Sequence, residues 1–101
     1  ELIVAKQLRN CFLALKVTYF NQVKDFCDAQ EIDFDQVRKF ITDDHRINDS
    51  HSTVTKEKGY GGHCFPKDML ATIRSAQVAG SNITILEEAD VYNQKVRKGI
   101  T

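Results

Sequence analysis

The sequence contains no tryptophan, and it has one proline and five glycines in 101 residues. So few helix-breaking residues favour long regular elements over many turns. An excess of charge is also missing, because 14 basic and 14 acidic residues give a formal net charge of zero. This balance gives no reason to expect nucleic acid or an anionic membrane surface as a partner. The length suits one small domain.

The sequence also lacks the patterns of a membrane or signal segment, of a disulfide framework and of a metal site. No apolar run is long enough for a transmembrane helix, and the first residues do not have the layout of a signal peptide. The three cysteines are an odd number without the spacing of a disulfide framework, so a reducing cytoplasm is the expected compartment. The cysteines and the three histidines match no common set of metal ligands, and we expect no metal site.

The first 29 residues contain neither proline nor glycine and are crowded with apolar side chains. They predict one long helix from Glu1 to about Ala29, buried on most of its circumference, with Cys11 and Cys27 as packing residues. At 1.5 Å per residue such a helix runs about 40 Å, which is more than a compact domain of this size can cover. We therefore expect further domains or a second copy of the chain to lie against it.

Lys6 and Asn10 are among the polar residues that interrupt the apolar part of this helix. They are four residues apart and so share one face, one turn above the other. A lysine in such a position is either held against a partner, because an unpaired buried ammonium is costly, or extends to solvent past its apolar stem. Spacing alone leaves both interpretations open.

A second, short helix is predicted from Phe34 to about Thr42, with Asp33 as its N-cap. Its apolar residues should face inward: Phe34, Val37, Phe40 and Ile41. A polar, turn-prone stretch then starts a long loop that continues to Cys64, and loops of that length in small domains are often functional. Arg46 lies in this loop between acidic residues, as a surface ion pair or as a bidentate clamp on phosphate or sugar hydroxyls.

Two more helices complete the prediction. The third runs from Pro66 to about Ala79 and ends at Gly80. The fourth runs roughly from Ile83 to Lys98, capped by Ser81 or Asn82, with acids in its early turns and bases near its end: Glu87, Glu88, Lys95, Arg97 and Lys98. No stretch has the pattern of a strand, so the sequence predicts an all-α fold.

The segment from Gly59 to Asp68 reads Gly-Tyr-Gly-Gly-His-Cys-Phe-Pro-Lys-Asp. Its glycines permit backbone angles that other residues avoid and a close approach of a ligand to the main chain. Cys64 is expected just outside the amino end of the helix that Pro66 opens, where unpaired N–H groups and the helix dipole favour an anion. The hypothesis is that Cys64 is a nucleophile; the alternative is a small buried cysteine beside a loop.

Three separated motifs occur in a fixed order: Lys6-x-x-x-Asn10, Asp44-x-Arg46-Ile47, and Gly-Gly-x-Cys-x-Pro-Lys-Asp ending at Asp68. Together they resemble the central domain of the UDP-glucose/GDP-mannose dehydrogenase family, most of all its UDP-glucose dehydrogenases. The resemblance implies that residues 1–101 are a helical central and dimerisation domain, inactive alone. The cofactor domain and the carboxy-terminal nucleotide domain of the family would lie outside it, in keeping with the lack of a Gly-x-Gly-x-x-Gly fingerprint.

The same resemblance implies a chemistry, the NAD-dependent oxidation of UDP-glucose to UDP-glucuronate in two hydride transfers. Cys64 would attack the aldehyde stage to form a thiohemiacetal and then a thioester, which water hydrolyses. Lys6 would stabilise the oxygen anion that develops at the reacting carbon, and Asn10 would help to hold it. Asp68 would lie near Lys6 and position water or relay a proton.

The resemblance also implies the binding residues. The UDP-sugar would contact Lys6, Asn10, Arg46, Tyr60, Gly61 and Gly62, with Arg46 reaching the substrate of the neighbouring subunit. Lys67 would lie near the NAD cofactor, and the long first helix would form the core of a homodimer. Other functions stay open: a GDP-mannose or UDP-N-acetyl sugar dehydrogenase, a helical dimerisation module without chemistry, or a redox-sensing thiol protein.

Overall fold

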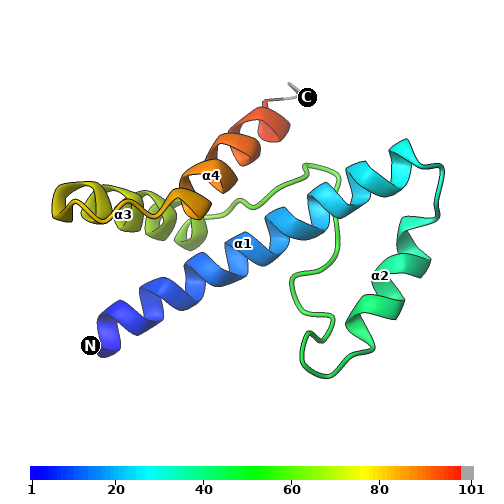
Figure 1. Ribbon diagram of the computed structural model, residues 1–101, viewed down its shortest axis with the longest axis horizontal. Coiled ribbons are helices and arrows are strands. Elements are labelled where there is room, and N and C mark those ends of the chain that lie inside the picture. The colour runs from blue at the N-terminus through cyan, green and yellow to red at the C-terminus, as the bar shows by residue number, and fades with distance from the viewer. Residues whose placement is uncertain (99–101) are drawn as a thin grey trace.

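The computed structural model describes residues 1–98, which form four helices and no strand (Figure 1). The helices are α1 (Leu2–Ala29), α2 (Phe34–Thr42), α3 (Cys64–Ala79) and α4 (Thr84–Arg97). The predicted all-α fold is confirmed. Among the described residues, no helix combines the length and the apolar character needed to cross a membrane.

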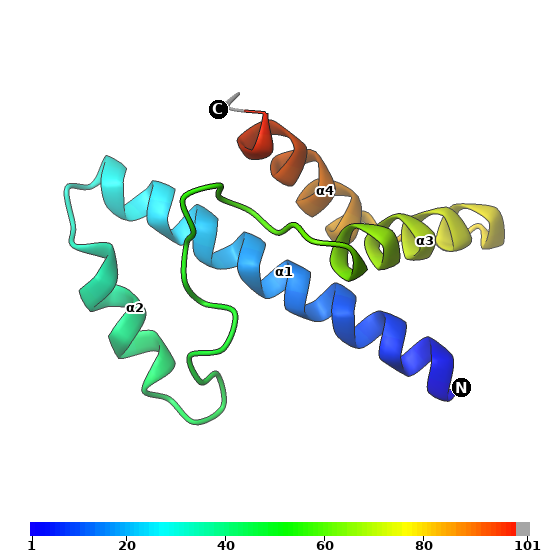
Figure 2. The ribbon, with the colours of Figure 1, turned by 180° about the vertical axis from the view of Figure 1, so that it is seen from behind.

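Helix α1 sets the long dimension of the molecule. Its 28 residues rise about 42 Å, and the longest extent of the whole structure is 43 Å. Helices α3 and α4 pack along one side of α1, and α2 packs near its carboxyl end (Figure 1). The segment 43–63, which joins α2 to α3, crosses α1 on the face turned to the viewer in Figure 2.

Within residues 1–98, α1 is not buried on most of its circumference, and its cover by further domains or a second copy stays a prediction. Seven of its large apolar residues are exposed: Leu2, Ile3, Val4, Leu8, Phe12, Tyr19 and Phe26. The physical reason is that three short helices and one loop can cover only part of a helix that spans the whole molecule. Helix α1 therefore carries more large apolar side chains than the rest of the described chain covers.

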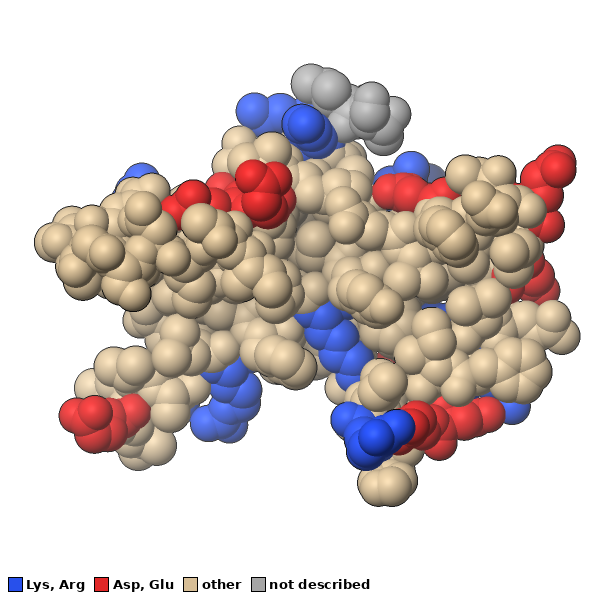
Figure 3. All heavy atoms as spheres, in the orientation of Figure 1, with Lys and Arg blue, Asp and Glu red and all other residues tan. Residues whose placement is uncertain are grey.

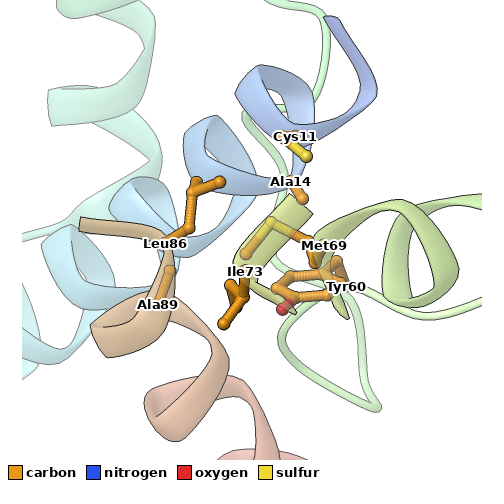
Figure 4. Close-up of a cluster of buried hydrophobic side chains, with 7 residues drawn as sticks. All are labelled: Cys11, Ala14, Tyr60, Met69, Ile73, Leu86 and Ala89. Atoms are coloured by element: carbon orange, nitrogen blue, oxygen red, sulfur yellow. The ribbon is translucent and has the colours of Figure 1, made fainter. Parts of the chain in front are cut away.

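The main hydrophobic core lies where α1, α3 and α4 meet (Figure 4). Side chains from all three helices and from the loop point toward one another there: Cys11, Ala14, Tyr60, Met69, Ile73, Leu86 and Ala89. A second cluster, formed by Phe20, Cys27 and Phe34, joins α1 to α2. Cys11 and Cys27 are each 2% exposed, which confirms both as packing residues.

Helix α2 has the predicted bounds, and its cap is confirmed because the Asp33 carboxylate accepts the Asp35 N–H at 3.0 Å. The expected inward position of Phe40 is wrong, since its side chain is 72% exposed. Phe34, Val37 and Ile41 already form the stripe that meets α1, and Phe40 lies about 100° around the helix from Ile41. A helix packed on one neighbour has no second surface to cover it.

Helix α3 begins at Cys64, two residues before the predicted start, with His63 as its N-cap residue. Pro66 falls inside the first turn, where its missing N–H costs nothing because no acceptor exists for it. Cys64 is therefore the first residue of the helix and does not lie outside it. The other end agrees with prediction, since Gly80 closes the helix in the left-handed conformation with φ +73°.

Helix α4 begins one residue later than expected, at Thr84. The expected caps, Ser81 and Asn82, are wrong: Ile83 occupies the N-cap position and makes no side-chain cap bond. The predicted charge order is confirmed at both ends of the helix. Glu87 lies in the first turn, Lys95 and Arg97 lie in the last, and Lys98 is the C-cap residue.

Candidate active site

A polar seam joins the amino-terminal half of α1 to the first turns of α3. Asn10 Nδ2 donates to Asp68 Oδ2 at 2.8 Å, and Gln7 Nε2 donates to Thr72 Oγ1 at 2.7 Å. The Asp68 side chain is only 14% exposed, so this carboxylate is held in place largely out of solvent. The structure thereby brings together two of the predicted catalytic residues, Asn10 from the first sequence motif and Asp68 from the third.

Cys64 is exposed and lies at the first position of α3. Because it precedes Asp68 by four residues, the thiol and the carboxylate share one face of the helix. Asn10 reaches the same carboxylate from α1. A thiol and a carboxylate thus lie in the first turns of α3, and a carboxamide from α1 is bonded to the carboxylate. Backbone N–H groups without helical partners at this end of the helix favour a negative charge.

Cys11 is the other thiol near this seam, and its surroundings differ. Its Sγ lies 3.3 Å from Thr72 Oγ1 and 3.5 Å from the Asp68 carbonyl oxygen. Burial raises the pKa of the Cys11 thiol, the hydrogen bond to Thr72 opposes that rise, and the charge of Asp68 adds to it. Cys11 is therefore held as a protonated packing residue, and Cys64 is the accessible thiol of the pair.

Two lysines flank the seam, and they differ in their contacts. Lys67 Nζ lies 3.8 Å from Asp68 Oδ1, and its side chain is 60% exposed. Lys6 is exposed, one turn before Asn10 on α1, and within residues 1–98 it makes no hydrogen bond or ion pair. The expected proximity of Lys6 to Asp68 stays a prediction.

The glycine loop, which we define as residues 59–62, leads directly into α3. Gly59 and Gly62 have φ of +63° and +81°, in the left-handed region that favours glycine. A Cβ at Gly59 would overlap Asn93 Oδ1, and one at Gly61 would overlap the Arg97 guanidinium. A Cβ at Gly62 would meet nothing within 4 Å, so the backbone at Gly62 is open to an approaching molecule.

Tyr60 lies in this loop with its ring in the core, and its exposed fraction is 3%. Its hydroxyl donates to Asp90 Oδ1 at 3.4 Å. Burial raises the pKa of Tyr60, and the nearby Asp90 and Cys11 add to that effect. The side chain of Tyr60 anchors the loop, and contact of Tyr60 with a sugar nucleotide stays a prediction.

Two residues that the sequence interpretation missed hold the loop backbone, Asn21 of α1 and Asn93 of α4. Asn21 Oδ1 accepts the Gly59 N–H at 2.9 Å, and the Asn93 carboxamide pairs with both the N–H and the carbonyl of Tyr60. Both asparagines are buried. The signal that could have identified them is a carboxamide on the apolar face of a helix. Such a group is buried and must find hydrogen-bond partners inside the protein.

Arg46 forms an ion pair within its own loop. Its Nε donates to Asp44 Oδ1 at 2.9 Å and its Nη2 to Asp44 Oδ2 at 2.6 Å. The Arg46 guanidinium holds the pKa of Asp44 below its usual range, by the side-chain hydrogen bonds first and the backbone one second. The Arg46 side chain is 79% exposed, so a bound anion could reach it.

Arg46 also lines a groove of about 840 Å³, which we call the α1 groove. Its floor is α1, and its walls are α4 and the end of α2 with the residues that follow: Phe12, Leu15, Tyr19, Ile41, Ile47, Ile85, Ala89 and Tyr92 are among its lining residues. None of Cys64, Asn10 and Asp68 lines it. On the face drawn in Figure 3, where α1 runs between α4 and α2, residues other than Lys, Arg, Asp and Glu cover most of the surface.

Residues 3–95 match the family model described as UDP-glucose/GDP-mannose dehydrogenase family, central domain. This chain belongs to the UDP-glucose/GDP-mannose dehydrogenase family. All three sequence motifs, including Lys6, Arg46 and Cys64, lie inside the matched range. The resemblance read from the motifs is therefore confirmed at the level of the family.

Two similar members of this dehydrogenase family come from Pseudomonas aeruginosa and Rhizobium meliloti. The chain is 35% identical over 94 residues to the UDP-glucose 6-dehydrogenase of Pseudomonas aeruginosa, and 32% identical over 95 residues to that of Rhizobium meliloti. These alignments cover 93% and 94% of this chain but 20% and 21% of the two relatives. The chain thus spans about a fifth of the length of the curated relatives that it matches.

Within residues 1–98, no group of three or more His, Cys, Asp and Glu side chains lies close enough together to hold a metal ion. The polar groups of the seam instead belong to a thiol, a carboxamide and a carboxylate. These are groups of nucleophilic and acid–base chemistry.

Proposed function

We propose that this chain is the central domain of an NAD-dependent dehydrogenase that oxidises UDP-glucose to UDP-glucuronate. The observation that carries the proposal is the hydrogen bond from Asn10 to Asp68, 2.8 Å long. This bond joins α1, which carries Lys6 and Asn10, to α3, which begins at Cys64. Membership of the family and the names of the similar relatives support the same substrate class.

Cys64 is the nucleophile of this reaction. Its Sγ adds to the aldehyde carbon of the half-oxidised sugar, and the aldehyde oxygen takes up the proton of the thiol, which gives a thiohemiacetal. Loss of a hydride from carbon and a proton from oxygen converts this adduct into a thioester. Water then cleaves the thioester, so that a carboxylate leaves and the thiol is restored. Cys64 is exposed at the first turn of α3, so its Sγ is accessible to the aldehyde carbon.

Lys6 and Asn10 stabilise the oxygen that carries negative charge during these steps. The Asn10 carboxamide has two N–H groups, and one of them is held by Asp68. That bond fixes the plane of the amide and so the direction of the second N–H. Lys6, one turn away on the same face, adds a cation. Asp68 positions the hydrolytic water or relays a proton.

NAD would supply, when bound, the hydride acceptor, with one NAD used in each of the two transfers. The residues of this chain fit only part of such a cofactor: Lys67, 60% exposed in the first turns of α3, offers a cation to a phosphate group. The sequence contains no Gly-x-Gly-x-x-Gly fingerprint. Most contacts to NAD therefore belong to a domain outside this chain.

The UDP-sugar binds along the glycine loop, next to the seam. Gly62 presents open backbone, whereas Gly61 lies against the Arg97 guanidinium and Tyr60 is 3% exposed. Lys6 and Asn10 contact the reacting end of the sugar. Arg46 acts on the substrate of a neighbouring subunit, because it lines the α1 groove and not the seam of its own chain.

A second copy of the chain occupies the α1 groove and makes a homodimer. The groove is mostly apolar, and Phe12 and Tyr19 on its floor are 63% and 60% exposed. Exposed aromatic side chains grouped in a groove are typical of protein interfaces. This observation also favours the second candidate function, a helical dimerisation module without chemistry.

The test uses the full-length protein that contains this chain. With UDP-glucose and NAD, we expect two NADH for each sugar nucleotide consumed, and no NADH from residues 1–101 alone. GDP-mannose and a UDP-N-acetyl sugar, supplied in parallel, decide between the substrates of the family. A dimer that forms without NADH from any of the three would favour the dimerisation module.

A further inference from the structure

Two buried asparagines hold two consecutive residues of the loop that leads to Cys64. Asn93 Oδ1 accepts the Tyr60 N–H at 2.7 Å, and Asn93 Nδ2 donates to the Tyr60 carbonyl at 3.0 Å. Asn21 Oδ1 accepts the Gly59 N–H at 2.9 Å, and its Nδ2 donates to the Val17 carbonyl at 2.8 Å. Each carboxamide is thus used on both of its ends.

The chemistry of this contact is specific to a carboxamide. A carboxamide presents a donor beside an acceptor, which is the pattern that a backbone peptide group would present to Tyr60. A carboxylate in place of Asn93 would set a negative oxygen against the Tyr60 carbonyl, and an apolar side chain would leave both groups without partners. Asn93 is 8% exposed and Asn21 2%, so water cannot readily replace them.

Gly59 is fitted to the same contact. A Cβ on Gly59 would overlap the Asn93 carboxamide oxygen, and Gly59 has φ +63°. Both the space and the backbone angle require glycine at this position. The loop and helix α4 are therefore matched to each other by Gly59 and Asn93.

Gly59 and Tyr60, whose backbone the two asparagines hold, lie just before Cys64 in the sequence. Tyr60 precedes Cys64 by four residues, and its ring packs in the core cluster with Met69 and Ile73 of α3 (Figure 4). A shift of the Tyr60 backbone would therefore carry the start of α3 with it, and misplacements of about 1 Å at a reacting group can cost about 100-fold in rate.

We propose that Asn93, assisted by Asn21, is a positioning residue that clamps the glycine loop and so fixes Cys64 at the start of α3, the helix that carries Asp68. This proposal rests on the function proposed above. It adds a residue of α4, the last helix of the chain, to the machinery of a site built from α1 and α3. Asn93 acts through the loop and does not touch the substrate.

The test compares variants of the full-length protein. Asn93→Asp keeps the shape of the side chain and removes the donor, and Asn93→Ala removes both groups. Asn82→Ala is the exposed asparagine control. Phe34→Leu is a control for lost stability, because it weakens the separate cluster between α1 and α2. The readouts are amide hydrogen exchange of residues 59–61 and the kcat and KM of sugar-nucleotide oxidation, each per folded protein.

Both Asn93 variants should speed exchange of residues 59–61 at least about tenfold and lower kcat about 10- to 100-fold. Neither control should do so. Unchanged exchange in the Asn93 variants would overturn the clamp. If the Asn93 variants exchanged faster but their kcat fell no further than that of Phe34→Leu, the positioning role would be overturned. If the wild-type protein oxidised no sugar nucleotide, the proposed function would fail, while hydrogen exchange would still decide whether the clamp exists.

Discussion

Asn10 of α1 and Asp68 of α3 are joined by a hydrogen bond of 2.8 Å although 58 residues separate them in sequence. The bond connects the longest helix to the helix that begins with Cys64. It is the point at which two of the three sequence motifs meet in space. The candidate site is therefore a junction between helices, held by side chains that also have chemical roles.

Breaking this junction should lower the rate of oxidation more than it lowers stability. In the full-length protein, Asn10→Ala removes an oxyanion donor and the hydrogen bond to Asp68 Oδ2, so kcat should fall about 100- to 1,000-fold. Gln7→Ala is the matched control, because it breaks the neighbouring bond from α1 to Thr72. Steady-state kinetics of both variants would contradict the assignment if Gln7→Ala and Asn10→Ala lost kcat equally.

Charge placed on the floor of the α1 groove should dissociate the dimer. Phe12→Glu and Tyr19→Glu each bury a carboxylate against an apolar partner surface, and we expect the dimer Kd to rise about 30-fold or more. Sedimentation velocity over a range of concentrations measures this. Val78→Glu is the control, since Val78 is 91% exposed on α3 and does not line the groove. A dimer unaffected by both groove variants would place the interface elsewhere.

Loss of the α2 cap should loosen that helix alone. Asp33→Ala removes the acceptor of the Asp35 N–H, which should cost about 1 kcal/mol and speed hydrogen exchange of the α2 amides about fivefold. Asp43→Ala, at the opposite end of the same helix, removes an exposed pair with Lys39 and should change exchange little. Equal effects of the two substitutions would show that the cap does not hold α2.

The buried hydroxyl of Tyr60 should make the protein sensitive to alkali. Burial first, then the charge of Asp90 and its hydrogen bond, raises the pKa of Tyr60 above its usual value of about 10. The folded state then keeps a proton that the unfolded chain releases. The stabilising contribution is present below pH about 10 and is lost as the pH rises beyond it.

Tyr60→Phe should therefore lose stability less steeply than the wild-type protein above pH about 10. Chemical denaturation at a series of alkaline pH values gives the two slopes. Cys11 and Tyr92, whose pKa values are also raised, titrate in both proteins and so cancel from the difference. Parallel slopes would mean that Tyr60 ionises in the folded state as readily as in the unfolded one.

The elements that sequence predicted well are those with local causes. Asp33 and Gly80 cap their helices through contacts within a few residues, and the start of α2 and the end of α3 followed from them. Pro66 misled the prediction of α3, because proline is tolerated throughout a first turn and does not mark its first residue. Phe40 misled the prediction of the core, because periodicity shows which residues share a face but not how wide the covering surface is.

The residues of the site that belong to sequence motifs could be predicted, and those that only the packing of the helices brings to the site could not. Cys64 was found from residue types and their order, the roles of Asn10 and Asp68 came from the resemblance to the family, and the structure brings Asn10 and Asp68 into contact. Asn21 and Asn93 were missed because their partners lie 38 and 33 residues away. Only packing of α1 and α4 around the loop reveals that pairing.

The measurement that tests the central claim most directly is the product analysis of Cys64→Ser in the full-length protein, supplied with UDP-glucose and NAD. A serine hydroxyl is far less nucleophilic than a thiolate, so formation of the carboxylate should fall to background while sedimentation still shows the dimer. UDP-glucuronate formed at the wild-type rate by Cys64→Ser would contradict the assignment of Cys64 as the nucleophile.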